Sequence, residues 1–148
     1  MKKIIYTSAL LLFFGLLASC GKDKDAPIPT SEYSSAINGS WQLFYVSHQD
    51  YQPNGKPYGS LREENYKSGE LTETYSKPSS WSAVNPDSSY TGTYQIKQDS
   101  LIVNNLAPGK PETYRYKIDS LSNKQLVVRY FVHSSTGIST LGIVKYKK

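Results

Sequence analysis

Few side chains of this sequence are suited to acid–base or nucleophilic chemistry, and they form no recognisable constellation. The two histidines, His48 and His133, each lie in or beside a predicted loop. Residue order does not define a Ser-His-Asp triad, but no motif typical of an activated nucleophile occurs. The 12 acidic residues offer no preferred carboxylate pair for glycoside hydrolysis and no calcium-loop pattern. The sequence therefore predicts no catalytic residue, no metal site and no cofactor, and a protein that is not an enzyme.

The single cysteine, Cys20, stands where lipid chemistry would use it. It follows residues 17–19 (Leu-Ala-Ser), at the end of an apolar run that begins at Ile4 behind two lysines. Such a run is shorter than the roughly 20 residues that span a bilayer, but it matches the apolar region of a signal peptide. A lone cysteine forms no intramolecular disulfide. The stretch resembles the lipidation signal of bacterial lipoproteins, so we expect residues 1–19 to be a removed signal peptide and Cys20 to be acylated.

Acyl chains such as palmitate would decide membrane attachment. Each buried methylene contributes about 0.8 kcal/mol, whereas a lysine near an anionic membrane contributes about 1 kcal/mol in total. We therefore expect an outer-membrane protein held by the lipid on Cys20. Residues 22–25 (Lys-Asp-Lys-Asp) resemble the signal that exports lipoproteins of Bacteroidetes to the cell surface. The cell surface and the periplasmic face of the outer membrane both remain open.

The rest of the chain is predicted to be one domain behind a tether. Residues 20–36 contain Pro27 and Pro29 among small polar residues and predict a semi-extended, flexible tether. Residues 37–148 form the predicted domain. The net charge of +5 falls to +3 when Lys2 and Lys3 leave with the signal peptide. Because the remaining lysines are scattered, no nucleic-acid partner is expected.

Strand-like alternation dominates the domain, with 13 tyrosines in the chain. Tyrosine and β-branched residues suit a half-buried sheet surface. A polar stretch from His48 to Gly69 is predicted as a long loop in which a short strand could be hidden. Tight turns separate eight predicted strands, which favours an all-β antiparallel meander, sandwich or barrel with little helix. The predicted strands cover residues 41–47, 71–75, 81–84, 90–97, 101–104, 112–119, 125–132 and 138–146.

Three stretches together resemble the lipocalin-like domain of Bacteroidetes lipoproteins. They are the Gly-Ser-Trp at residues 39–41, the paired strands of residues 90–103, and residues 116–128. The resemblance covers residues 38–148 and implies an eight-stranded up-and-down β-barrel that holds a small ligand or is filled by side chains. It also implies a structural barrel floor formed by Gly39 and Trp41, with Arg129 as the basic residue that packs on the tryptophan ring.

Aromatic side chains are the candidates for ligand binding, because they combine an apolar face with a polar group. Most of them also fit a purely structural core. We expect a small apolar molecule or a glycan to bind at the barrel interior or mouth. The alternative is a non-enzymatic interaction subunit that docks on another cell-envelope protein through aromatic loops. The candidate ligand-binding residues are Tyr45, Tyr75, Trp81, Tyr94, Tyr114, Tyr116 and Tyr130.

Overall fold

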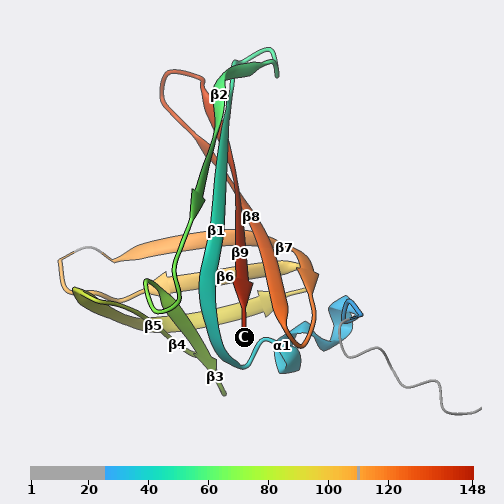
Figure 1. Ribbon diagram of the computed structural model, residues 1–148, viewed down its shortest axis with the longest axis vertical. Coiled ribbons are helices and arrows are strands. Elements are labelled where there is room, and N and C mark those ends of the chain that lie inside the picture. The colour runs from blue at the N-terminus through green and yellow to red at the C-terminus, as the bar shows by residue number, and fades with distance from the viewer. Residues whose placement is uncertain (1–25, 110) are drawn as a thin grey trace, which may run out of the picture.

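The computed structural model describes residues 26–109 and 111–148, which form an antiparallel β-barrel (Figure 1). The predicted signal peptide, Cys20 and the Lys-Asp pairs lie outside the described residues. No helix within the described ranges is long and apolar enough to cross a membrane. The strands are β1 (Gly39–Tyr51), β2 (Pro57–Asn65), β3 (Thr72–Ser76), β4 (Ser80–Asn85), β5 (Ser88–Lys97), β6 (Ser100–Asn105), β7 (Glu112–Leu121), β8 (Gln125–His133) and β9 (Ser139–Lys147).

Eight of these strands close the barrel. From β3 to β9 each strand pairs with the next one along the chain, and β1 pairs with both β3 and β9. This ring confirms the predicted eight-stranded, up-and-down antiparallel barrel. The ninth strand, β2, stands outside the ring: β1 pairs with β3 through Gly39–Gln42 and with β2 through Tyr45–Tyr51. An irregularity between Leu43 and Tyr45 separates the two halves of β1.

The upper halves of β1, β8 and β9, together with β2, rise beyond the barrel (Figure 1). We call this extension, residues 45–51, 57–65, 130–133 and 139–143, the arm. All nine residues of β2 are exposed. The stretch predicted as a long polar loop is therefore largely a hairpin, whose turn is at Pro53-Asn54-Gly55. Because both faces of β2 meet solvent, its sequence lacks the alternation that marks a half-buried strand.

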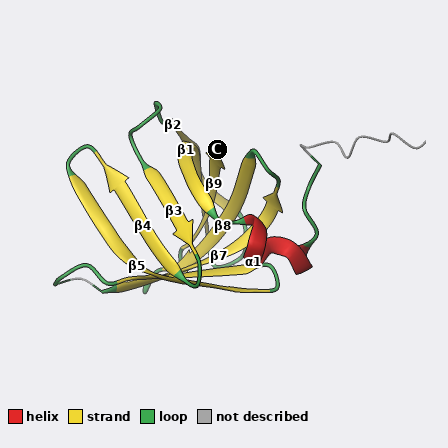
Figure 2. Cartoon of the chain, turned by 90° about the horizontal axis from the view of Figure 1, so that it is seen from below, coloured by secondary structure: helices red, strands yellow, loops and turns green. Residues whose placement is uncertain are grey.

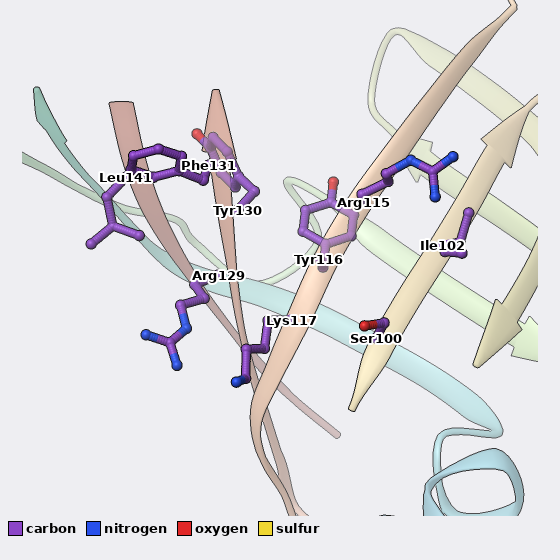
Figure 3. A pocket seen from close by; sticks show the side chains of 9 residues that line it. All are labelled: Ser100, Ile102, Arg115, Tyr116, Lys117, Arg129, Tyr130, Phe131 and Leu141. Atoms are coloured by element: carbon purple, nitrogen blue, oxygen red, sulfur yellow. The ribbon is translucent and has the colours of Figure 1, made fainter. Parts of the chain in front are cut away.

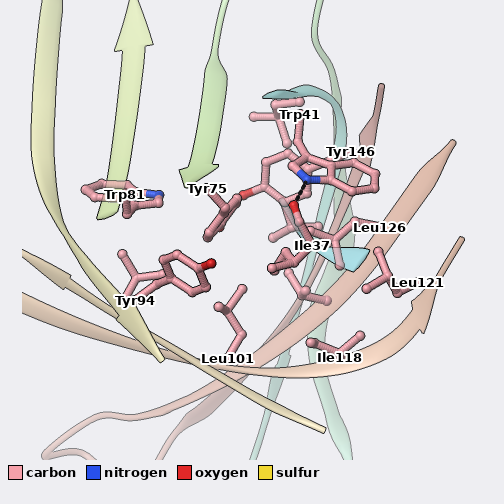
Figure 4. Packing of buried hydrophobic residues seen from close by; sticks show 14 of the residues in the cluster. Ile37, Trp41, Tyr75, Trp81, Tyr94, Leu101, Ile118, Leu121, Leu126 and Tyr146 are labelled. Atoms are coloured by element: carbon pink, nitrogen blue, oxygen red, sulfur yellow. Dashed lines mark hydrogen bonds between the residues drawn. The ribbon is translucent and has the colours of Figure 1, made fainter. Parts of the chain in front are cut away.

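The lower barrel interior is filled by side chains (Figure 4). Alternate residues of each strand point inward, which brings Trp41, Tyr75, Trp81 and Tyr146 together with aliphatic residues of β6, β7 and β8. The buried core and the partly buried residues packed on it all lie between Ile28 and Tyr146. The described segment thus contains a complete core and folds as one unit.

A short helical segment covers one end of the barrel (Figure 2). It consists of a 3-10 turn, η1 (Thr30–Glu32), and α1 (Tyr33–Ala36). Tyr33 is buried, and the Ile28 N–H donates to the Leu121 carbonyl over 2.6 Å. The expectation of a semi-extended tether up to residue 36 is therefore wrong for residues 28–36. The apolar surfaces of Ile28 and Tyr33 bind this segment to the barrel floor.

The predicted partner of the floor tryptophan is also wrong. Trp41 is fully buried, and its Nε1–H donates to the Ile37 carbonyl over 2.6 Å. The cation on its ring is Lys148, with Nζ 4.5 Å from the ring centroid. Arg129 instead points outward and pairs with Asp119 over 2.9 Å. Strand alternation explains the difference, because Arg129 follows the inward-facing Val128.

Candidate ligand-binding site

The wall of the barrel opens where β7 and β8 separate. Their ladder ends at the pair Lys117–Arg129. The same register would next place Tyr116 opposite Tyr130 and Arg115 opposite Phe131, but the ladder between β7 and β8 does not include these pairs. Figure 3 shows Tyr116 and Tyr130 on the two diverging strands. We call this opening the seam.

Two adjoining grooves occupy the seam, with volumes of about 570 and 510 Å³. Volumes of this size suit a small organic molecule. Both grooves are lined by Arg115, Tyr116, Tyr130 and Phe131, so they meet across the seam. The first groove adds Ser100, Ile102, Lys117, Arg129 and Leu141, and the second adds Thr113, Tyr114 and Val132.

A row of aromatic rings forms the inner side of the seam. Tyr114 stacks on Tyr116 with the ring centroids 6.4 Å apart, and Tyr116 meets Tyr130 edge-on at 6.1 Å. The Tyr130 hydroxyl shares a 2.8 Å hydrogen bond with Nδ1 of His48. His48 therefore belongs to a strand and supports a ring of the seam, whereas the sequence suggested a histidine in or beside a loop.

Gly142 makes room for the Tyr130 ring. A Cβ atom at Gly142 would lie 2.2 Å from the Cζ atom of Tyr130. Any larger residue would push the ring away from β9 and toward the seam. The position of Tyr130 thus depends on a glycine of the neighbouring strand as well as on the hydrogen bond to His48.

A buried carboxylate lies in the interior near the seam. Glu73 accepts hydrogen bonds from the Tyr75 hydroxyl at 2.6 Å, from Trp81 Nε1 at 3.0 Å and from the Tyr146 hydroxyl at 2.7 Å. Burial is the main cause that raises the pKa of Tyr116, and the charge of Glu73 adds to it. An acidic group therefore lies close enough to act electrostatically on an aromatic ring of the seam.

The structure separates the predicted ligand-binding residues into three groups. Tyr114, Tyr116 and Tyr130 line the seam. Tyr75, Trp81 and Tyr94 are buried in the core. Tyr45 lies on β1, where its hydroxyl donates to Glu63 and Lys145 covers its ring.

Sequence reasoning missed Glu73, Arg115 and Phe131. The signal for Glu73 was present, since it shares the phase of Leu71 and Tyr75 in a predicted strand. Arg115 and Phe131 alternate with Tyr116 and Tyr130 along exposed strand faces, and the separation of β7 from β8 makes them groove residues. Within the described ranges, no group of three His, Cys, Asp or Glu side chains is placed to hold a metal ion.

A closed eight-stranded barrel with an aromatic groove is typical of the class of proteins that bind small hydrophobic ligands. The family model described as a lipocalin-like domain matches residues 37–128, and the chain belongs to this family. Members of this family typically bind molecules rather than catalyse reactions, and the match indicates no enzymatic family.

Solved structures with a similar fold come from several bacteria. A lipocalin-like protein from Bacteroides uniformis is 20% identical, with a TM-score of 0.48 over 76% of this chain and 98% of that chain. An uncharacterized protein from Bacteroides eggerthii is 14% identical, with a TM-score of 0.45 over the same shares. A polyisoprenoid binding domain from Saccharophagus degradans is 9% identical, with a TM-score of 0.35 over 72% and 97%. No curated protein matches the chain significantly.

Proposed function

We propose that this protein is an outer-membrane lipoprotein that binds a small apolar molecule in the seam between β7 and β8. The observation that carries the proposal is the separation of these strands beyond Lys117 and Arg129, which opens adjoining grooves of about 570 and 510 Å³. Core side chains fill the lower barrel, so the seam is a better ligand-binding site than the barrel floor.

The lining of the seam favours an apolar molecule over a glycan. Phe131 and Val132 are each 53% exposed. Ile102 and Leu141 extend the same apolar surface in the first groove. A ligand that covers these side chains gains about 25 cal/mol per Å² of apolar area removed from water. The tyrosine hydroxyls add polar contacts that orient it.

Cys20 is the proposed lipid attachment site, on the strength of the signal-like residues before it. The chain reaches the barrel at its floor, where Ile28 and Tyr33 pack. Attachment from this end would direct the arm away from the membrane. Radioactive palmitate should label the wild-type protein in cells and fail to label Cys20→Ser. Protease treatment of intact cells distinguishes the cell surface from the periplasmic face.

Binding in the seam is tested with dodecanol and residues 26–148, by isothermal titration calorimetry. Phe131→Ser is the informative variant, because the side chain lines both grooves and is exposed, so that its loss leaves the core intact. We expect the affinity of this variant for dodecanol to fall about tenfold, which corresponds to about 1.4 kcal/mol of binding free energy. Leu106→Ser is the matched control, since Leu106 is 61% exposed and lines neither groove. Equal affinities for the two variants would place the ligand elsewhere.

The exposed arm supports docking on an envelope protein as a second candidate function. Tyr58 and Leu61 of β2 are 52% and 53% exposed, and among the described residues β2 pairs only with β1. A long exposed edge strand is a template for pairing with another chain. Crosslinking in intact cells through a photoreactive residue at position 61 tests this candidate, and a crosslinked envelope protein that disappears when Tyr58→Ser is added would favour it.

A further inference from the structure

We propose that the ligand of the seam is an amphiphile with one anionic head group, and that Arg115 binds that head. This inference rests on the proposed function, because it specifies the chemistry of the ligand in the same grooves. It is carried by the charges that line the seam, by the backbone edge that β7 exposes there, and by the buried carboxylate in the interior.

The charged side chains that line the two grooves are all positive. They are Arg115, Lys117 and Arg129. Two of them have acidic partners outside the grooves: Lys117 lies 3.2 Å from Asp99, and Arg129 lies 2.9 Å from Asp119.

Arg115 differs from the other two cations, because it forms no ion pair within the described part of the chain. Its side chain is exposed and lines both grooves. The guanidinium group of Arg115 is therefore the cation available to an anionic head group. Its planar array of N–H donors also matches a carboxylate or a phosphate.

The backbone N–H of Arg115 adds a hydrogen-bond donor that faces the seam. The Ile118 N–H donates to the Asp99 carbonyl over 2.6 Å, toward β6. Because N–H groups alternate in direction along an antiparallel strand, the odd-numbered residues of β7 direct theirs toward β8. At Arg115 the ladder with β8 has already ended, at Lys117–Arg129. The N–H of Arg115 therefore faces the seam.

Glu73 determines the orientation of the ligand. It is buried in the interior, where it accepts hydrogen bonds from Tyr75, Trp81 and Tyr146. Together with burial, its charge also raises the pKa of Tyr116. An anionic group that moved inward past Tyr116 would meet this carboxylate and lose its water, which disfavours that orientation. The head group therefore stays at Arg115, and the apolar body lies against Tyr116, Tyr130 and Phe131.

The test compares ligands that share one apolar chain and differ in the head group. Dodecanoate, dodecanol and dodecyltrimethylammonium are titrated into residues 26–148, the two ionic amphiphiles below their micelle concentrations and dodecanol below its solubility limit. We expect dodecanoate to bind most tightly, about fivefold above dodecanol, because an exposed ion pair contributes up to about 1 kcal/mol. Dodecyl phosphate is the fourth probe. A preference for it over dodecanoate would indicate a phospholipid-derived ligand, and the reverse would indicate a free fatty acid.

A pair of variants locates the anion. Arg115→Gln should remove the advantage of dodecanoate over dodecanol. Lys56→Gln is the matched control, because it removes the same charge from the exposed turn of the β1–β2 hairpin, outside both grooves. It should leave all affinities unchanged. Circular dichroism verifies that both variants are folded.

The outcomes separate this inference from the proposed function. Equal affinity for dodecanoate and dodecanol, or a preference for the ammonium amphiphile, would overturn the anionic head group while binding in the seam stands. The same loss of dodecanoate binding in both variants would overturn the role of Arg115. If no probe binds, the proposed function fails together with the inference.

Discussion

The ammonium group of Lys148 lies 4.5 Å from the ring centroid of Trp41 and donates a 3.0 Å hydrogen bond to the Asn38 carbonyl. The last residue of the sequence thus packs on the tryptophan of the first strand. Gly39, next to Asn38 in the chain, has a φ of +121°, and a Cβ atom at this position would lie 3.2 Å from the Lys148 side chain. The backbone conformation and the close contact both favour glycine at this position.

Removal of the Trp41 side chain should destabilise the whole barrel. Trp41 is completely buried, and a tryptophan-to-alanine change in a core typically costs about 3–5 kcal/mol. We expect Trp41→Ala to lower the free energy of unfolding in urea by that amount, or to prevent folding. Tyr58→Ala is the control, since Tyr58 is half exposed on β2. A melting temperature unchanged by Trp41→Ala would contradict a structural role for this residue.

Lys148 should stabilise the floor, and Arg129 should have no effect on it. A cation over a tryptophan face contributes about 0.5–2 kcal/mol. We expect Lys148→Met to lower the free energy of unfolding within that range. Lys147→Met is the neighbouring control, because the cation placed over the Trp41 ring is Lys148 and not Lys147. If Arg129→Met changed the tryptophan fluorescence of the folded protein and Lys148→Met did not, the assignment of the floor cation would be wrong.

Glu73 should be needed for stability because three buried donors depend on it. Glu73→Leu would leave the Tyr75 and Tyr146 hydroxyls and the Trp81 indole N–H without their acceptor. Each buried donor without a partner costs about 1–3 kcal/mol. We expect Glu73→Leu to lower the free energy of unfolding, measured in urea, by at least about 3 kcal/mol. Glu73→Gln retains one acceptor oxygen, so its loss should be clearly smaller; equal losses would exclude the hydrogen bonds as the cause.

Alternation of apolar residues predicted most of the strands and an antiparallel β domain, whereas the closed barrel was implied by the family resemblance. Residues such as Ile118, Leu126 and Val128 alternate with charged or exposed neighbours, and the structure buries the apolar members. The helical segment of residues 28–36 and the full length of β2 were not predicted, each for its own reason. Tyr33 and Ile28 are too few to form a visible pattern, and β2 has no buried face.

The seam could not be predicted from local sequence, because it depends on register and strand direction. Residues 112–116 of β7 alternate as regularly as those of a paired strand do. An irregularity between Ile118 and Ser120 accompanies the end of the ladder between β7 and β8. By contrast, the inward direction of Glu73, which sequence reasoning missed, is present in the sequence as its shared phase with Tyr75. Phase can be read from a sequence, but the angle between two strands cannot.

Gly142 should control the position of the Tyr130 ring. A methyl group at Gly142 would overlap the ring, with its Cβ only 2.2 Å from Cζ. We expect Gly142→Ala to cost about 1–3 kcal/mol, as overpacking does, and to break the hydrogen bond between Tyr130 and His48. Urea unfolding measures the cost, and the chemical shifts of the His48 ring report the hydrogen bond.

Tyr130→Ala provides the control for this prediction. In the absence of the ring, the added methyl group of Gly142→Ala meets no obstacle. The double variant should therefore be no less stable than Tyr130→Ala alone, a coupling that a double-mutant cycle detects. A cost of Gly142→Ala that persisted without the Tyr130 ring would show that the strand itself requires glycine.

The buried tyrosines should make the barrel sensitive to alkali. Burial, with the charge of Glu73 nearby, raises the pKa of Tyr75 and Tyr146 well above the ordinary value of 10.0. Above pH 10 the unfolded chain therefore loses protons that the folded protein keeps, so unfolding releases protons. The stability present below pH 10 must then fall as the pH rises, by about 1.4 kcal/mol per pH unit for each such tyrosine.

Urea unfolding between pH 9 and pH 11.5 measures this slope. Tyr75→Phe should be less stable than the wild type at pH 8, because the bond to Glu73 is lost. Its loss of stability above pH 10 should nevertheless be shallower by about 1.4 kcal/mol per pH unit, since one fewer tyrosine releases a proton on unfolding. Tyr58→Phe, on the exposed strand β2, should keep the wild-type slope. Parallel slopes for Tyr75→Phe and the wild type would mean that Tyr75 already ionises in the folded barrel.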